Sequence, residues 1–159
     1  MCKLCWTSVV VLLLAVVGMG YKFILSGEVV ATADGREAIV LEPAERDMVL
    51  AEMRQFLESI QAISEGIVND DMAAVVNAAR PMGTAAQQGV PGSLVRKLPL
   101  GFKTMGFDTH TQFEQLALDA EQLGDGEYAL GQLVELMQNC TACHAMYRFE
   151  TAASLQEVQ

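Results

Sequence analysis

Residues 127–150 read EYALGQLVELMQNCTACHAMYRFE and hold the most informative pattern in the chain. Side chains suited to a protein core recur there in alternating steps of three and four, which is the spacing of one face of an α-helix. These inward positions are Leu130, Leu133, Met137, Cys140, His144 and Tyr147. The tripeptide Gly124-Asp125-Gly126 separates the segment from what precedes it. We predict one amphipathic helix from residue 127 to about residue 150.

Three upstream segments show the same spacing, over residues 44–68, over residues 70–88 and from Asp108 or Thr109 to residue 123. Their inward positions are, in chain order, Leu50, Met53, Leu57, Ile60, Ser64 and Ile67; Met72, Val75, Val76, Ala79 and Met82; and Phe113, Leu116, Ala117 and Ala120. Pro81 predicts a kink or an early end in the second of these helices. Amphipathic helices with short connections predict an all-α fold, an antiparallel four-helix bundle.

Residues 90–107 are predicted to form the one long loop of the bundle. They contain prolines and glycines that interrupt regular structure, namely Pro91, Gly92, Pro99, Gly101 and Gly106. A short turn is expected within this loop at residues 94–97.

The N-terminal segment is nearly all apolar from Trp6 to Leu25, with Lys22 as the only serious interruption. About 20 such residues suffice to cross a bilayer as a helix, so we expect an N-terminal transmembrane helix. The alternative is a cleaved secretory signal, because Lys3 precedes the apolar run and Ala31-Thr32-Ala33 resembles a small-residue cleavage site. Either one sends the rest of the chain out of the cytoplasm.

Three regions therefore follow one another along the chain: a membrane anchor or signal segment at residues 1–26, a juxtamembrane connector at residues 27–43 and the bundle domain at residues 44–159. Within the connector, two short apolar runs flank an Asp34-Gly35 turn signal, so a small hairpin or an extended excursion is expected.

The chain of 159 residues carries 20 acidic and 10 basic side chains, which give a formal net charge of −10. Such a surface repels the phosphates of nucleic acids and argues against a nucleic-acid partner. The same charge could steer a basic redox partner, or it could simply keep the domain soluble. The length fits one domain with a single modest core.

The segment Cys140-Thr141-Ala142-Cys143-His144 carries the pattern by which haem c is attached to proteins. In that pattern the two thiols add to the vinyl groups of the porphyrin as thioethers, and the adjacent imidazole is the proximal iron ligand. We therefore expect one covalent haem c, held by Cys140 and Cys143, with His144 on the iron.

Two other uses of a Cys-x-x-Cys pair fit this sequence less well. A zinc site needs about four ligands, and the only other histidine, His110, has polar neighbours that predict a solvated surface position. A thioredoxin-like pair needs the support of a helix N-terminus, whereas this pair lies near the end of its predicted helix. The second pair, Cys2 and Cys5, lacks a following histidine; it is a candidate for acylation on the cytoplasmic side, or has no role.

The block from Cys140 to Arg148 resembles the attachment segment of the class II cytochromes c, the cytochrome c-prime superfamily, which commonly continues with an aromatic residue and an arginine. The resemblance covers about residues 44–150 and leaves the anchor and the connector outside. It implies a four-helix bundle with the attachment motif on the last helix. It also implies electron transfer, and a homodimer formed through the first two helices.

The resemblance implies a methionine from the first helix as sixth iron ligand in the low-spin branch, and aligning the turn between the first two helices places Met53 there. Met53 also lies on the predicted inward face of its helix, which ordinary core packing explains as well. Met48 is the weaker substitute. High-spin members leave that side of the iron vacant, and some bind small gases. The arginine that many members carry shortly before this position has no match, since Val49 stands there.

Tyr147 and Arg148 follow the motif after Ala145 and Met146. Tyr147 falls one helical turn beyond His144, so it is expected to pack against the haem or elsewhere in the core. Arg148 is expected to neutralise a haem propionate, or to remain solvated at the end of the helix.

These features predict a monohaem electron carrier tethered to the inner membrane, with its domain facing the periplasm, that exchanges electrons with redox proteins. If the N-terminal segment is cleaved, the carrier is soluble in the periplasm. The alternative functions are a five-coordinate haem protein that binds nitric oxide or carbon monoxide, and a structural bundle without a functional haem. The sequence shows no catalytic triad and no phosphate-binding loop, so we do not expect an enzyme.

Overall fold

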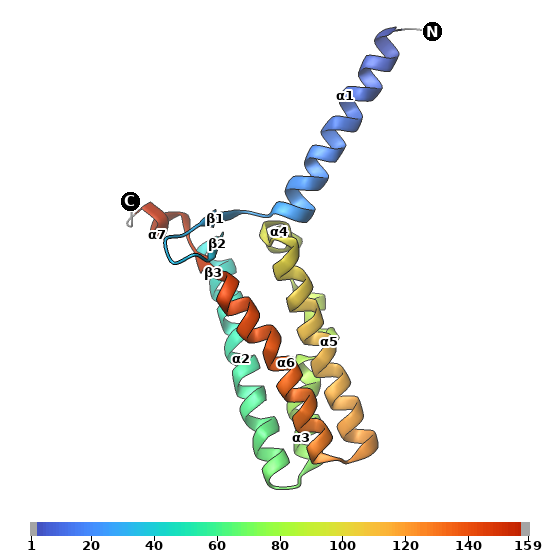
Figure 1. Cartoon of the computed structure of the whole chain (residues 1–159), viewed down its shortest axis with the longest axis vertical. Coiled ribbons are helices and arrows are strands. Elements are labelled where there is room, and N and C mark those ends of the chain that lie inside the picture. The colour runs from blue at the N-terminus through green and yellow to red at the C-terminus, as the bar shows by residue number, and fades with distance from the viewer. Residues whose placement is uncertain (1–2, 157–159) are drawn as a thin grey trace.

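The computed structural model describes residues 3–156, and Leu4 and Cys5 are described by their backbone alone. The side chains of Cys2 and Cys5, which were considered as candidates for acylation, lie outside the described part of the structure. Within the described part, helices dominate and one small three-stranded sheet accompanies them (Figure 1). The prediction of an all-α fold is confirmed in this broad form, with the sheet as an addition.

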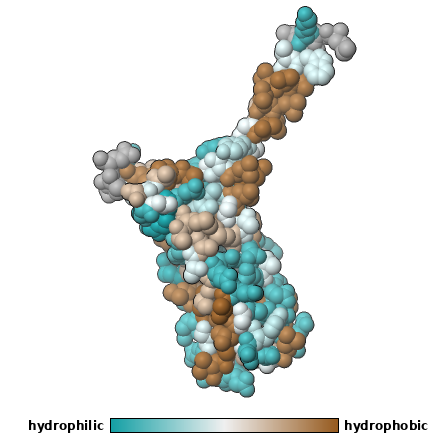
Figure 2. Space-filling view, viewed as in Figure 1, coloured by the Kyte–Doolittle hydropathy of each residue, from teal (hydrophilic) through white to brown (hydrophobic). Residues whose placement is uncertain are grey.

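An apolar helix forms the N-terminal part of the structure and points away from the rest of the molecule (Figure 1). It consists of α1 (Lys3–Gly20) and a π-helical segment, η1 (Tyr21–Ser26). The stretch Trp6–Ser26 has 21 residues, and its most apolar part is not buried in the molecule. Figure 2 shows a hydrophobic surface along this helix. Its length and composition suit a membrane anchor or a signal sequence.

The sheet joins the connector to the C-terminal part of the chain. β1 (Val29–Ala31) and β2 (Glu37–Val40) form the expected antiparallel hairpin. Gly35 in its turn has a φ of +83°, which glycine adopts without strain. β3 (Tyr147–Glu150) pairs with β2 in parallel. Ile39 of the central strand is fully buried, so the sheet covers one end of the helices.

Helices fill most of the chain from residue 43 onward. They are α2 (Pro43–Val68), α3 (Met72–Ala79), the 3-10 segments η2 (Arg80–Met82) and η3 (Thr84–Gly89), α4 (Gly92–Lys97), α5 (Leu100–Leu123), α6 (Gly126–Met146) and, after β3, α7 (Ala152–Gln156). α2 packs against α3 and α6, and α5 packs against the same two helices. We call α2, α3, α5 and α6 the helical body.

Local sequence signals explain where these helices begin and end. Asp71 and Asp125 cap α3 and α6, and each carboxylate accepts a hydrogen bond from a backbone N–H three residues further on. Gly124 ends α5 in the left-handed conformation. α3 ends at Ala79 and Pro81 lies in the turn that follows, so the predicted early end of this helix is confirmed.

The loop predicted at residues 90–107 is only half present. Its expected short turn is α4, but α5 begins at Leu100 rather than at Asp108 or Thr109. The first turn of α5 carries Phe102, which is buried in a cluster with side chains of α4, β2 and α2. Burial of this apolar face outweighs the low helix propensity of the two glycines in the segment.

The last helix is shorter than predicted. α6 ends at Met146 and Tyr147 begins β3, so the prediction that Tyr147 extends the helical stripe of His144 is wrong. The edge of β2 offers backbone hydrogen-bonding groups to this segment. In addition, Tyr147 and Phe149 both pack edge-on against Phe102. These long-range contacts override the helical pattern.

The buried face of α2 is adjacent to the predicted one. The buried residues of this helix are Val49, Phe56, Ser59, Ile63 and Gly66. Leu57, which the pattern placed inward, is 67% exposed. α2 carries apolar residues on two neighbouring faces, one toward the core and one toward the cavity described below, so helical spacing alone identified the wrong one as core. In contrast, Phe113, Leu116, Ala117 and Ala120 of α5 are buried as predicted.

Candidate functional site

A cavity of about 620 Å³ opens where α2, α5 and α6 approach the sheet. All six side chains that the sequence pattern and the family resemblance indicated for a cofactor line it. They are Cys140, Cys143 and His144 from α6, Met53 from α2, and Tyr147 and Arg148 from β3. The fold therefore brings the motif at the end of α6 together with a methionine from the first half of α2.

Apolar side chains form most of the cavity wall. Leu50, Leu57 and Ile60 line it from α2, on the same helical face as Met53, and Phe107 lines it from α5. Leu57 is 67% exposed and Phe107 is 47% exposed. Large apolar side chains that remain exposed in a concave site are typical of a surface that a ligand covers.

Positive charge gathers around this cavity although the chain as a whole is acidic. Among the described residues that line it, Arg36, Arg54, Lys103 and Arg148 are basic, and Glu52 is the single carboxylate. The whole chain has twice as many acidic as basic residues, 20 against 10. An apolar cavity with cationic groups around it fits a ligand that is mostly apolar and carries acidic groups.

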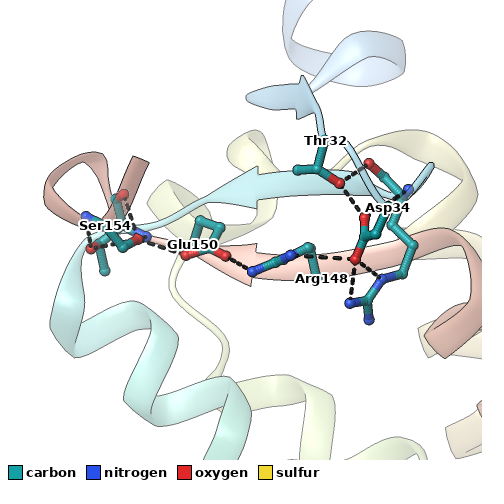
Figure 3. Close-up of polar contacts among 7 residues, drawn as sticks. Thr32, Asp34, Arg148, Glu150 and Ser154 are labelled. Carbon is teal, nitrogen blue, oxygen red and sulfur yellow. Dashed lines mark hydrogen bonds and ion pairs between the residues drawn. The ribbon is translucent and has the colours of Figure 1, made fainter. Parts of the chain in front are cut away.

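Arg148 is held in an ion-pair network at the edge of the cavity (Figure 3). Its Nη1 lies 3.3 Å from Asp34 Oδ2, and its Nη2 contacts the Glu150 carboxylate. Arg36 Nη2 lies 2.6 Å from the same Asp34 oxygen. Hydrogen bonds from Thr32 and Arg36 hold the pKa of the Asp34 carboxyl well below its ordinary value. Arg148 is thus fixed between two carboxylates rather than freely solvated.

Tyr147 reaches the cavity from β3 and rests against the first turn of α5. Its ring meets Phe102 edge-on, with the ring centroids 5.7 Å apart. Its hydroxyl lies so close to Gly101 that a β-carbon there would be 2.6 Å from the Tyr147 oxygen. Partial burial raises the pKa of the Tyr147 hydroxyl. Tyr147, the aromatic residue after the motif, therefore packs the segment that follows α6 against the first turn of α5.

His110 is buried in the cavity wall, so the expectation of a solvated surface position is wrong. It is 5% exposed, its Nδ1 lies 2.7 Å from the carbonyl oxygen of Met82, and its Nε2 lies 3.5 Å from Glu52 Oε1. Because a carbonyl oxygen only accepts, Nδ1 carries the proton of that hydrogen bond. Burial raises the pKa of the Glu52 carboxyl, and the neighbouring His110 opposes that shift.

A spacing signal could have identified His110 as a buried residue. Phe113 and Ala117 follow it by three and seven positions, and both are buried on the same face of α5. The polar neighbours misled because Thr109 is itself buried, with its hydroxyl donating to the backbone carbonyl of Met105.

The two thiols of the motif are free and partly buried. Burial raises the pKa of Cys140, and burial together with the neighbouring Cys140 raises the pKa of Cys143 to about 11. A dithiol that exchanges disulfides needs a readily formed thiolate, which these environments disfavour. Among residues 3–156, no group of three or more His, Cys, Asp and Glu side chains is placed to hold a metal ion.

The residues present fit a covalent haem c. The two thiols and the imidazole line one side of the cavity from α6, the apolar walls suit a flat macrocycle, and the surrounding cations suit its two propionates. The cavity volume falls within the range of about 300–1,000 Å³ found for ligand and cofactor sites. Cys140, Cys143 and His144 would hold the group, and Met53 would supply a thioether from α2.

No protein-family model, no curated protein and no solved structure matches this chain significantly. The chemistry assigned to the cavity therefore rests on its own residues.

Proposed function

We propose that this chain is a monohaem c-type cytochrome of the class II kind, with α2, α3, α5 and α6 as its antiparallel four-helix bundle. The supporting observation is that the Cys140–His144 motif and Met53 line one apolar cavity surrounded by cations. Haem iron held in this way cycles between the ferrous and ferric states and so accepts and releases single electrons. The proposed role is an electron carrier, not an enzyme.

Each part of the cavity has a defined task in this proposal. Cys140 and Cys143 would form the covalent links, and His144 would offer its imidazole to the iron. Met53 offers a thioether, a neutral soft ligand that stabilises the ferrous state and raises the potential. Leu57 and Phe107 lose their exposure to water when the cavity is filled, which favours retention of the group.

Arg148 and Arg36 offer guanidinium N–H donors where acidic groups of the ligand would lie. Both side chains line the cavity, and both are oriented by Asp34. Fixed guanidinium groups bind carboxylates without further loss of side-chain freedom. This arrangement supports the expectation that Arg148 neutralises a propionate, and it adds Arg36 from the hairpin.

The proposed location is the inner membrane, with the helical body in the periplasm and redox proteins as partners. Retention of the apolar segment is supported by the hairpin that follows it. Cleavage after Ala33 would remove β1 from the sheet, together with the hydrogen bond between the Glu28 N–H and the Lys97 carbonyl oxygen. A membrane-bound carrier meets its partners at a high effective concentration. A homodimer through the first two helices remains part of the proposal by resemblance alone.

The proposal is tested by producing the full chain together with the bacterial cytochrome c maturation machinery. We expect the denatured protein to stain for haem on a gel. The matched control replaces both motif cysteines by serine (Cys140→Ser and Cys143→Ser) and should not stain. A protein that matures normally, keeps its helix content and never stains would contradict the proposed function.

One absorption spectrum of the haem, recorded with and without carbon monoxide, distinguishes electron transfer from the alternative five-coordinate, gas-binding function. A low-spin ferrous protein that does not respond to carbon monoxide supports Met53 on the iron and electron transfer. A high-spin protein that binds carbon monoxide promptly supports a gas-binding role instead.

A further inference from the structure

The anchor does not leave the helical body through a free linker. The backbone N–H of Glu28 donates to the carbonyl oxygen of Lys97 at 2.7 Å, and the carbonyl oxygen of Glu28 accepts from the Val40 N–H at 2.8 Å. Closer to the membrane segment, Lys103 Nζ lies 2.9 Å from the carbonyl oxygen of Ile24. We call residues 22–28 the joint, since they fix the end of η1 against α4 and α5.

Gly27 is the tightest point of the joint. Its φ is +66°, and a β-carbon there would lie 2.5 Å from the Lys97 carbonyl oxygen and 2.6 Å from the Pro99 nitrogen. Neither the left-handed backbone nor the available space accepts a side chain without displacement. Lys22 Nζ adds a hydrogen bond to the Gly27 carbonyl oxygen at 2.8 Å. The joint is therefore a close backbone contact that glycine makes possible.

The cavity lies at the same end of the helical body as the joint. Leu98 and Lys103 both line the cavity and contact the joint. Along α5 the cavity wall runs from Phe102 to His110, about 12 Å of helix at 1.5 Å per residue. α5 then continues to Leu123 at the far end, away from the anchor (Figure 1). A cofactor in this cavity would lie close to the membrane surface.

Acidic residues are concentrated at the end of the helical body that lies far from the anchor. Residues 58–80 and 114–135 form the far end of the helical body and hold ten Asp or Glu but a single basic residue, Arg80. That arginine is paired with Glu121 at 2.6 Å. The rest of the described domain and joint, residues 22–57, 81–113 and 136–156, holds nine Asp or Glu and eight Lys or Arg, so it is almost neutral. Anionic lipids therefore repel the far end much more strongly than the end near the anchor. The charges therefore favour an upright orientation, which is also the orientation that the joint imposes.

We propose that the joint holds the cavity at the membrane surface in one orientation, so that the haem exchanges electrons with a redox protein embedded in the same membrane. This inference rests on the proposed haem and on insertion of the anchor. Electron transfer slows steeply with distance, so a cofactor fixed near the membrane serves partners whose redox groups lie at a similar level. A water-soluble carrier that docked on the acidic far end would remain remote from the cavity.

The orientation is tested with the full chain in nanodiscs of phosphatidylcholine and phosphatidylglycerol. A fluorescent unnatural amino acid at position 122, an exposed position in the last turn of α5, reports its distance to acceptor-labelled lipid headgroups, independently of haem. Gly27→Ala disturbs the joint, and Gly89→Ala is the matched control because a β-carbon there meets nothing within 4 Å. We expect one narrow distance distribution for the unaltered chain and for Gly89→Ala, and a broad one for Gly27→Ala. A broad distribution in the unaltered chain overturns the inference.

A second variant guards against misfolding of Gly27→Ala. A flexible insertion of about six Gly and Ser residues between Ser26 and Gly27 frees the anchor and leaves the packing of Gly27 against Lys97 and Pro99 in place. Circular dichroism should show unchanged helix content, and the distance distribution should broaden. A distribution that stays narrow with the insertion would show that the joint does not set the orientation.

The partner is tested by following oxidation of the haem in washed membranes of the source organism. We expect washing to leave the rate unchanged and the insertion variant to react about tenfold more slowly with the same haem spectrum. If haem oxidation stops after washing and resumes only when the soluble fraction is added back, the partner is not embedded in the membrane. An unchanged oxidation rate in the insertion variant would also contradict the inference. A preparation without haem contradicts the proposed function and leaves the distance measurement standing.

Discussion

The hydroxyl of Tyr147 rests against Gly101, and a β-carbon at residue 101 would lie 2.6 Å from that oxygen. This contact joins β3 to the first turn of α5, two segments that the chain separates widely. It places the aromatic residue after the motif in the wall of the cavity, although that residue lies on a strand and not on the helix of His144. Gly101 is thus a packing requirement inside a helix.

Replacing Gly101 by Ala should destabilise the protein, because the new methyl group displaces Tyr147. We expect a loss of about 1–2 kcal/mol in the free energy of unfolding, the overpacking cost less the gain in helix propensity. Denaturant unfolding measures it. Tyr147→Phe removes the crowded oxygen and should restore part of the loss in the double variant.

Gly131→Ala provides the matched control within another helix, α6, and away from the cavity. A β-carbon there meets nothing within 4 Å, so the substitution should stabilise the protein by about 0.5–1 kcal/mol. Equal effects at residues 101 and 131 would show that the Tyr147 contact carries no energetic weight.

Met53→Ala should convert a low-spin haem spectrum to a high-spin one that responds to carbon monoxide, since the thioether of the cavity wall is lost. The reduction potential should fall, because a neutral soft ligand that favours ferrous iron is removed. Met48→Ala is the control, because Met48 is 48% exposed and does not line the cavity. A spectrum that Met53→Ala leaves unchanged would exclude Met53 as a ligand.

Glu45 should make folding stability depend on pH at the junction of α2 and α4. Its carboxylate accepts a hydrogen bond from Lys97 Nζ at 2.7 Å, which lowers the Glu45 pKa from 4.5. Below both the folded and the unfolded pKa the group is protonated in either state and contributes nothing. Above pH 4.5 the charged pair should stabilise the fold by up to about 1 kcal/mol, and this is lost as the pH falls through the folded pKa.

The measurement compares the free energy of unfolding of the unaltered chain with that of Glu45→Gln from about pH 3 to pH 7, because carboxylates titrate in the lower part of this range. The difference should be largest near neutral pH and decrease toward the acidic end. Glu58→Gln, an exposed position on the same helix, should show no such trend. A constant difference at every pH would contradict the role of the Glu45–Lys97 pair.

Truncation should distinguish a retained anchor from a cleaved signal. A chain that begins at Gly27 keeps β1, whereas a chain that begins at Asp34 loses it together with the Glu28–Lys97 hydrogen bond. We expect the shorter chain to be less stable by about 1–3 kcal/mol, on the scale of a few backbone hydrogen bonds. Equal stability, together with a natural N-terminus at Asp34 by mass spectrometry, would favour the cleaved signal.

Local signals in the sequence predicted the helices and the cavity residues on α6 well. The caps at Asp71 and Asp125, the break at Gly124 and the early end before Pro81 depend on residues close in the chain. The haem-attachment motif was equally easy to recognise from the sequence, because its five residues are consecutive. These features are set by backbone chemistry that neighbouring residues determine.

The features that were missed depend on distant partners. β3 forms because β2 offers an edge, and helical spacing in residues 147–150 carries no information about that edge. His110 lies on the same buried face of α5 as Phe113, where the backbone carbonyl oxygen of the distant Met82 accepts a hydrogen bond from its polar ring. Leu57 could not be assigned from spacing, because α2 faces both a core and a cavity.

The central claim, a haem held covalently in the cavity, is tested most directly by the mass of the purified, matured protein after extraction with acidified acetone. We predict that one haem remains on the polypeptide, and that none remains when Cys140 and Cys143 are both serine. A polypeptide of unmodified mass, with any porphyrin recovered in the solvent, would contradict the account.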